Sequence, residues 1–210
     1  MFTWIHSCPQ RSKFVAQTID SVADSDIDQW TLWAHSDELK SAEEIELWWE
    51  ERLLEAAEKS DYFLRLEDDV VVNKYITHNI MGWPAIHRQD FGVGSVFDLS
   101  DTSWYRFKES DGSVWNQEVW ITAQGLVFRS ELVPSLVKKM REIRGDAFKF
   151  RRVFRLNFDQ VVAAAMHDLG YKVFFHEPCL VDCVPGNGQS VVGENHDDYR
   201  AKNFDPDWRR

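Results

Sequence analysis

The stretch Tyr62-Phe-Leu-Arg-Leu-Glu67-Asp68-Asp69-Val-Val-Val-Asn73 decides the fold of this chain. It is an apolar run that ends in three consecutive carboxylates and then resumes. Three adjacent acids between apolar runs are costly to bury unless something positive neutralises them. The stretch therefore predicts a strand with an acidic tip, and a divalent cation carrying a phosphorylated ligand is the expected partner.

Strands and helices alternate around this stretch. We expect strands over Phe2–Ser7 and Trp30–Ala34, each followed by a helix, and a capping box of Ser41 and Glu44 opens the second helix. The acid-tipped strand then comes third. Its carboxylates should lie at the carboxyl end of a strand, where open α/β sheets bind ligands. The pattern predicts an α/β fold.

The second half of the chain contains a further helix with polar residues at its start. We expect this helix over residues 157–170, with Asp159 in its first turn, and a strand over 171–175. The helix dipole should lower the pKa of Asp159, although Asp159 also fits a plain helix cap. Residues 119–128 read as a pair of strands interrupted at Gln124 and Gly125, and Ser130 can cap the next helix.

Composition limits the classes of protein that remain. A chain of 210 residues suits one domain, and 44% hydrophobic residues exclude a disordered tail. No apolar run approaches the roughly 20 residues that span a bilayer. The N-terminus has no basic leader before an apolar core, so we expect no signal peptide and a cytoplasmic location. The three cysteines form no disulfide framework, which fits a reducing compartment.

A basic strip over residues 138–155 interrupts an otherwise acidic chain. The net charge of -11 argues against indiscriminate nucleic-acid binding. The strip carries only two acids, Glu142 and Asp146, against eight cations: Lys138, Lys139, Arg141, Arg144, Lys149, Arg151, Arg152 and Arg155. It is either a solvated helix end or a surface that docks an anionic acceptor or partner.

Ten tryptophans suggest contact with flat or apolar ligand faces, since indoles stack on sugar rings and on bases. Trp48 and Trp49 lie at helical spacing and are expected in the core. Trp104, Tyr105 and Trp115 lie in a less regular region, and we interpret them as candidates for stacking on an acceptor.

The order of several short motifs resembles that of GT-A glycosyltransferases, enzymes that use nucleotide sugars. The motifs are Cys8-Pro9-Gln10-Arg11, Ala34-His-Ser-Asp37, Leu66-Glu-Asp-Asp-Val70, Ala123-Gln-Gly-Leu-Val-Phe-Arg-Ser-Glu131, Phe158-Asp-Gln160 with Leu169-Gly-Tyr171, Pro178-Cys-Leu-Val-Asp-Cys183 and Gly186-Asn-Gly-Gln-Ser190. The resemblance implies a GT-A fold, a mixed and mostly parallel sheet flanked by helices. It implies one catalytic domain over 1–210, with a nucleotide-sugar half (1–78) and an acceptor half (79–210).

The resemblance also implies a donor site for a nucleoside-diphosphate sugar, with a UDP-sugar expected first. Mn²⁺ or Mg²⁺ would be held by Asp69, with Glu67 or Asp68 assisting. Strand alternation places Glu67 and Asp69 on one face and Asp68 on the other. The other donor contacts implied are Arg11 to the diphosphate, Asp37 to the nucleoside, and Gln189 and Ser190 in a loop over the diphosphate.

For catalysis, the resemblance implies that Asp159 accepts the proton of the acceptor hydroxyl, with inversion at the anomeric carbon. Glu118 is the reserve candidate for this base. Retention stays open, because stereochemistry depends on distances that a sequence does not give.

One position departs from the related sequences. Cys183 stands where they often carry a metal-binding histidine, and a thiolate is a poor ligand for a hard cation. Either the acids and phosphate oxygens hold the metal, or His196 supplies the imidazole. A zinc cluster of His176, Cys179 and Cys183 is a further, less favoured reading.

The acceptor is open between two classes. The first is a hydroxyl of a glycan or glycolipid. The second is a hydroxylated base in DNA, with phosphates held by the basic strip, including Arg151 and Arg152. Two other readings keep the fold: a GT-A module that binds but no longer catalyses, and a nucleotidyltransferase.

Overall fold

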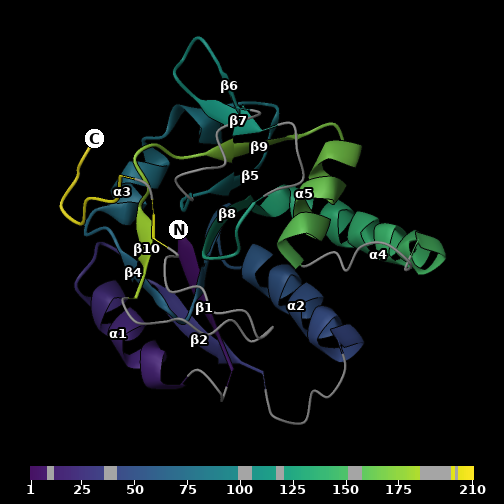
Figure 1. The fold of residues 1–210 in the computed structure, drawn as a ribbon, viewed down its shortest axis with the longest axis horizontal. Coiled ribbons are helices and arrows are strands. Elements are labelled where there is room, and N and C mark those ends of the chain that lie inside the picture. Colours follow the sequence, from purple (N-terminus) through teal and green to yellow (C-terminus); the bar gives the residue numbers. More distant parts are fainter. Residues whose placement is uncertain are drawn as a thin grey trace.

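The computed structural model describes residues 1–8, 12–35, 42–98, 106–116, 121–150, 158–184, 200–201 and 203–210. These residues form an α/β domain around an eight-stranded sheet of order β2-β1-β3-β8-β5-β9-β7-β6, with β10 and β4 paired beside it (Figure 1). The elements are β1 (Phe2–Ser7), α1 (Ser12–Ala23), β2 (Trp30–Ala34), α2 (Ala42–Ala57), β3 (Tyr62–Glu67), β4 (Val70–Val72), α3 (Ile76–Met81), η2 (Pro84–His87), β5 (Phe91–Ser95), β6 (Arg106–Lys108), β7 (Val114–Asn116), β8 (Gly125–Arg129), η4 (Ser130–Leu132), α4 (Val133–Phe150), α5 (Phe158–Asp168), β9 (Lys172–Phe175) and β10 (Val181–Cys183).

The sheet is mixed. Strand β1 runs parallel to both β2 and β3, and β5 runs parallel to β9, whereas β8 is antiparallel to β3 and β5. The predicted order of strand, helix, strand, helix and strand is confirmed for residues 2–67. The predicted helix that carries Asp159 and the strand after it are confirmed as α5 and β9.

Two layers of helices cover the sheet, and the alternation of side chains decides what each layer contacts. On β3, Phe63 faces the core shared with α2, α4 and α5, and Leu64 and Leu66 face the core shared with α1 and α3. Trp48 and Trp49 of α2 pack against the first core, as predicted. Since Arg65 and Glu67 follow Phe63 at a period of two, they point to the α2 side.

The acidic stretch itself differs from the prediction. Strand alternation was expected to continue through the acidic tip, Glu67 to Asp69, but β3 ends at Glu67 and residues 68 and 69 form a turn. The chain then enters β4, which pairs antiparallel with β10 in a second sheet. Strand alternation therefore cannot place Asp69 on the face of Glu67, and that part of the prediction is wrong.

Two further expectations are wrong. Residues 121–124 form no strand, and a single strand, β8, begins at Gly125. Ser130 does not cap the following helix: it opens η4, and its hydroxyl donates to the carbonyl of Ser60. That bond ties the end of β8 to the segment before β3.

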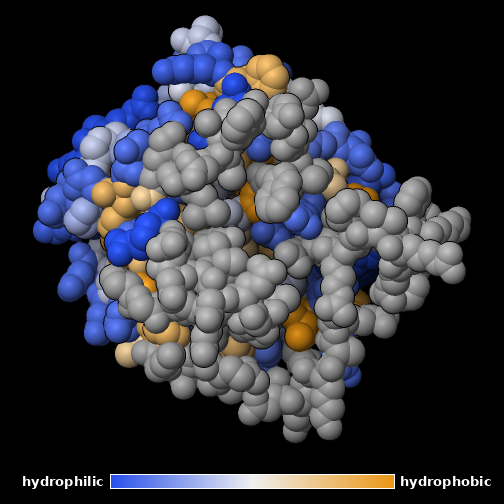
Figure 2. All heavy atoms as spheres, in the orientation of Figure 1, coloured by the Kyte–Doolittle hydropathy of each residue, from blue (hydrophilic) through white to orange (hydrophobic). Residues whose placement is uncertain are grey.

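Large apolar side chains that remain exposed are scattered over several elements: Leu32, Leu47, Leu54, Met81 and Phe107. The face seen in Figure 2 shows hydrophobic residues only in small separate patches. No helix in the described ranges is both long enough and apolar enough to cross a membrane.

Gly94→Ala is expected to destabilise the fold by about 1–3 kcal/mol, because overpacking a buried strand forces its neighbours to move. A Cβ at Gly94 would meet two ring carbons of Trp83 at 2.5 and 2.8 Å. Thermal unfolding measures the loss. The control is Gly145→Ala in α4, where a Cβ meets nothing within 4 Å and the helix should gain about 0.5–1 kcal/mol. Equal melting temperatures for the two variants would contradict the packing seen at β5.

Candidate functional site

The carboxyl ends of β1, β2 and β3 meet at one edge of the sheet. In the strand register, His6 of β1 lies beside Glu67 of β3, and Ser7 lies beside Ala34 of β2. The acidic turn, Asp68 and Asp69, follows directly after β3. This edge is therefore where the predicted carboxylates and the ends of three parallel strands converge, as ligand sites of α/β sheets do.

Asp68 is part of the framework of this edge. Its side chain is fully buried, and its Oδ2 accepts hydrogen bonds from the Ser7 hydroxyl at 2.6 Å and the Cys8 amide at 3.4 Å. These bonds join the end of β1 to the turn after β3. A carboxylate held in this way is poorly suited to contact a donor directly.

The backbone of the turn is also fixed from both sides. The Thr18 hydroxyl of α1 donates to the Asp68 carbonyl at 2.8 Å and accepts from the Val70 amide at 3.1 Å. From the other side, the Val184 amide donates to the Asp69 carbonyl at 2.7 Å. Asp69 is 3% exposed, so its carboxylate has little freedom to reorient.

Glu67 lies in a buried network on the α2 face of the sheet. Arg65, which is fully buried, donates from Nη2 to Glu67 Oε1 at 2.6 Å and from Nη1 to the Ala123 carbonyl at 2.7 Å. His6 Nδ1 lies 3.2 Å from Glu67 Oε2, and the Trp49 indole donates to His6 Nε2 at 3.2 Å. Both oxygens of Glu67 therefore already have protein partners.

The indole fixes the protonation of His6. An indole N–H is only a donor, so Nε2 of His6 accepts, and Nδ1 then carries a proton directed at Glu67. Arg65 Nη2 lies 3.1 Å from the same Nδ1 and, because it is also only a donor, does not bond Nδ1 in this tautomer. Burial lowers the pKa of His6 because it removes water from the imidazolium, although Glu67 acts in the opposite direction. We infer a neutral His6 that orients Glu67.

Asp159, in the first turn of α5, belongs to the same neighbourhood. Burial raises the pKa of Asp159 to about 6. Hydrogen bonds from the backbone amides of Gln160 and Asp159, and the charge of Arg65, lower this pKa, whereas the charge of Glu67 adds to the increase. The guanidinium of Arg65 lies 5.1 Å from the ring centroid of Phe158, the preceding residue. The expected lowering by the helix dipole is wrong, because loss of water outweighs the amide dipoles.

Trp115 lies apart from this edge. It is on β7, four strand positions from β3 in the sheet, or about 19 Å at the usual spacing. Phe107 stacks on its ring at 4.8 Å between centroids, and the Lys172 ammonium lies 4.4 Å from the ring centroid. These contacts join Trp115 to the neighbouring strands β6 and β9, and its role in stacking on an acceptor stays a prediction.

Ten of the predicted site residues lie outside the described residues: Arg11, Asp37, Trp104, Tyr105, Glu118, Arg151, Arg152, Gln189, Ser190 and His196. Their assignments stay predictions.

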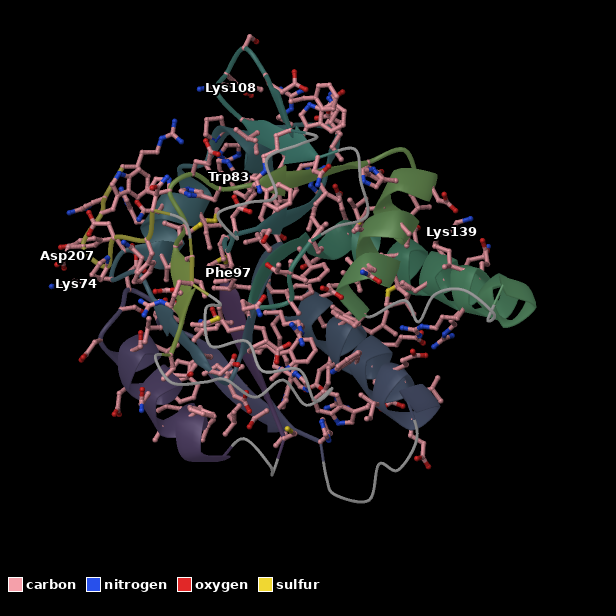
Figure 3. The ribbon with its side chains drawn as sticks, viewed as in Figure 1. Lys74, Trp83, Phe97, Lys108, Lys139 and Asp207 are labelled. Carbon is pink, nitrogen blue, oxygen red and sulfur yellow. The ribbon has the colours of Figure 1, made fainter. Side chains whose placement is uncertain are left out.

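Part of the basic strip is neutralised by helix α2. Arg141 Nε donates to Glu50 Oε2 at 2.7 Å, and Arg144 bonds Glu50 and lies 3.2 Å from Glu46. Glu50 is fully buried, so these bonds join α4 to α2. Lys139, which extends outward from α4 in Figure 3, pairs with Glu142 at 2.6 Å. Two of the four strip cations whose side chains are described, Arg141 and Arg144, thus belong to a contact between helices.

The zinc reading has no support. In the part of the chain that the structure describes, no three His, Cys, Asp or Glu side chains are placed to hold a metal ion together. His176 Nδ1 lies 2.7 Å from the Pro178 carbonyl, and burial lowers the pKa of His176 to about 4. Burial raises the pKa of Cys179 to about 12, which disfavours the thiolate that zinc requires. Cys183 ends β10 beside Val70, so it does lie next to the acidic turn.

Comparisons with solved structures give the architecture a known counterpart. The fold is similar to that of the galactosyltransferase LgtC. A structure of LgtC with donor and acceptor sugar analogues superposes with a TM-score of 0.55 and 14% sequence identity, over 90% of this chain and 88% of LgtC. An active-site mutant of LgtC gives a TM-score of 0.52 and 13% identity, over 83% and 72% of the two chains. No sequence-family profile matches the chain, and no curated protein sequence matches it.

The likeness to LgtC spans nearly the whole of both chains and establishes the fold. The chain is a single α/β domain of the GT-A type, with a mixed central sheet flanked by helices, as predicted. The expected predominance of parallel pairs is wrong: among the described strands of the eight-stranded sheet, three pairings are parallel and four are antiparallel. At this identity the likeness to LgtC assigns no residue a role, and the site rests on its own geometry.

Sequence reasoning missed four residues of the site: His6, Thr18, Trp49 and Arg65. Arg65 was visible as a signal, because a charged residue in the middle of an apolar strand needs a buried partner. The other three have roles defined by contacts with residues 43 to 61 positions away, and nothing near them in the sequence marks those contacts.

Proposed function

We propose that the protein is a metal-dependent glycosyltransferase that moves a sugar from a nucleoside-diphosphate sugar to an acceptor hydroxyl. One observation carries this proposal: a rigidly held acidic turn lies at the carboxyl edge of a GT-A sheet, with a half-buried carboxyl of raised pKa nearby. The fold supports sugar transfer as the reaction class, and the residues supply the parts it needs.

The acids of the turn fit a hard divalent cation, since carboxylate oxygens are the ligands that Mn²⁺ and Mg²⁺ prefer. We propose Asp69 as the main metal ligand, because the turn that carries it follows β3 at the carboxyl edge of the sheet and is fixed through its backbone by Thr18 and Val184. When bound, the metal would neutralise the charge that develops on the leaving diphosphate. The remaining ligands would come from the diphosphate and from water, and His196 is the alternative ligand that the sequence leaves open.

Asp159 is the proposed base. With a pKa of about 6 it is mostly ionised at pH 7, yet it is a stronger base than an ordinary aspartate. It would accept the proton of the acceptor hydroxyl during attack on the anomeric carbon from the face opposite the diphosphate. The proposed outcome is inversion, and the anomeric configuration of the first product, read by NMR, tests it.

We propose a glycan or glycolipid as the acceptor rather than DNA. Two arginines of the basic strip, Arg141 and Arg144, bond the carboxylate of Glu50, so they offer little charge to phosphates. Transfer to a hydroxylated base in DNA that falls steeply with rising salt would overturn this choice. We propose a cytoplasmic location, which fits three buried cysteines that the structure records as thiols and not as disulfides.

A screen of nucleotide sugars, each with Mn²⁺ and with EDTA, tests the proposed function. A true donor at 100 times its Kd should stabilise the protein by about 2.7 kcal/mol, a rise of about 5–11 °C in Tm, only when metal is present. It should then release a nucleoside diphosphate. Binding without any turnover would indicate a binding module, and release of pyrophosphate would indicate a nucleotidyltransferase. If no nucleotide sugar binds, the proposed metal–donor site is refuted.

A further inference from the structure

Side-chain hydroxyls of helix α1 form hydrogen bonds with the backbone amides along one edge of β4. The Thr18 hydroxyl accepts from the Val70 amide at 3.1 Å, and the Ser21 hydroxyl accepts from the Val72 amide at 2.7 Å. The other edge of β4 pairs with β10 in the usual antiparallel way. Residues 70 and 72 alternate along the strand, so the two hydroxyls stand where a neighbouring strand would place its carbonyls.

Thr18 and Ser21 bond different parts of the backbone. The Thr18 hydroxyl donates to the Asp68 carbonyl and accepts from the Val70 amide, so its two hydrogen bonds hold the backbone on both sides of Asp69. In the described part of the chain, the Ser21 hydroxyl bonds the amide and the carbonyl of Val72, beyond the turn. One buried hydroxyl thus closes the acidic turn, and the other secures the strand that follows.

We propose that Thr18 is a positioning residue for Asp69, and that it orients this carboxylate for the metal and the donor diphosphate. The inference has two parts. That Asp69 binds the metal and diphosphate rests on the proposed function, whereas that Thr18 positions Asp69 rests on the hydrogen bonds alone. The Thr18 hydroxyl uses its donor and one acceptor site at once, and Thr18 is fully buried, which leaves that hydroxyl a single orientation.

Loss of the hydroxyl would leave a buried carbonyl and a buried amide on either side of Asp69 without this partner. Such groups are costly to leave unbonded, so the turn should shift until water or another group reaches them. A metal ligand must be held to within a fraction of an ångström, because metal–oxygen distances are short and narrowly defined. A shift of the acidic turn that is too small to unfold the protein would therefore still weaken metal-dependent binding of the donor diphosphate.

The decisive variant is Thr18→Val, which keeps the shape of the side chain and removes the hydroxyl. Calorimetry with UDP, GDP and dTDP, each in Mn²⁺, measures binding. We expect Thr18→Val to weaken the nucleoside diphosphate that binds wild type by about 10–100-fold, as changes behind a metal ligand do. Thr18→Ser, which restores the hydroxyl, should bind within about threefold of wild type. If Thr18→Val does not fold, Thr18→Cys replaces it, since a thiol bonds more weakly and should give an intermediate loss.

Ser21→Ala is the matched control, because it removes a hydroxyl from the same helix and the same strand edge. It should lower Tm as Thr18→Val does and leave binding unchanged. Wild-type affinity in Thr18→Val, or an equal loss in Ser21→Ala, would overturn the proposal.

A second readout separates this inference from the proposed function. Hydrogen exchange at the Val70 amide should speed up in Thr18→Val and stay slow in Thr18→Ser and Ser21→Ala. If wild type binds no nucleoside diphosphate, the proposed function fails, and the positioning of Asp69 still stands or falls with this measurement. Unchanged exchange at Val70 in Thr18→Val would refute it.

Discussion

Asp69→Asn is expected to reduce metal-dependent donor binding by on the order of 100-fold or more, and to remove transfer with it. The substitution keeps the size of the side chain and replaces an anionic oxygen ligand with a neutral amide. Even changes one shell behind a metal ligand cost about 10–100-fold in metal affinity. Thermal shift and calorimetry with the donor found in the screen, with and without Mn²⁺, measure the loss.

The fold of Asp69→Asn should survive, because the turn is held through its backbone and not through this side chain alone. Asp61→Asn is the matched control: Asp61 immediately precedes β3 at the opposite edge of the sheet and should leave donor binding unchanged. Metal-dependent stabilisation that persists unaltered in Asp69→Asn would show that the metal is held elsewhere.

Asp159→Asn is expected to lower kcat by about 10²–10⁴-fold, the usual contribution of a general base, while donor affinity changes little. In wild type, kcat/KM should rise about tenfold per pH unit below pH 6 and level off above it, because the base must be ionised. This slope should disappear from the residual activity of the variant. Steady-state kinetics from pH 5 to 8 measure both effects.

The same substitution should stabilise the folded protein at high pH. The folded-state pKa of Asp159, about 6, lies above its ordinary value of 3.8, so the folded state binds the proton more tightly than the unfolded state. Stability attributable to this group is therefore greatest below pH 4 and is lost as pH rises through 6. Allowing for its partial exposure, the cost at pH 8 is about 2 kcal/mol, which asparagine would not have.

Denaturant unfolding at pH 5 and pH 8 distinguishes a base from a cap. An Asp159 that serves only to cap α5 would lose stability when replaced and would leave kcat nearly unchanged. If Asp159→Asn is more stable than wild type at pH 8 and has a much lower kcat, the Asp159 carboxyl serves catalysis and lowers the stability of the fold.

The sequence predicted correctly those elements whose structure is determined by residues close together in the chain. Apolar periodicity and caps located the first three strands and both intervening helices, and the motif order predicted the GT-A fold. It failed at the acidic turn, because Asp68 and Asp69 end β3 and lead into a different sheet without a glycine or proline to signal the turn. What makes the turn possible is distant: hydroxyls from α1 and an amide from residue 184.

Electrostatic predictions failed for a related reason. The position of Asp159 at a helix start correctly predicted amide contacts, but burial near Arg65 and Glu67, about 90 residues earlier in the chain, decides its pKa. Trp49 was correctly expected to pack on the core, and its helical spacing gave no hint that its indole N–H would fix the tautomer of His6.

The neighbours of β4 determine when, during synthesis, the acidic turn can take its final form. Val72 pairs with Val181 of β10, and Asn73 donates to the carbonyls of Asp205 and Trp208 at 2.7 and 2.9 Å. Lys74 and Asp207 accordingly lie at the same edge of the molecule (Figure 3). A ribosome-bound chain that already contains all three acids still lacks these supports until residue 208 has emerged. The first strands can thus pair early in synthesis, whereas the segment that continues from the acidic turn gains its full set of hydrogen-bond partners only after residue 208.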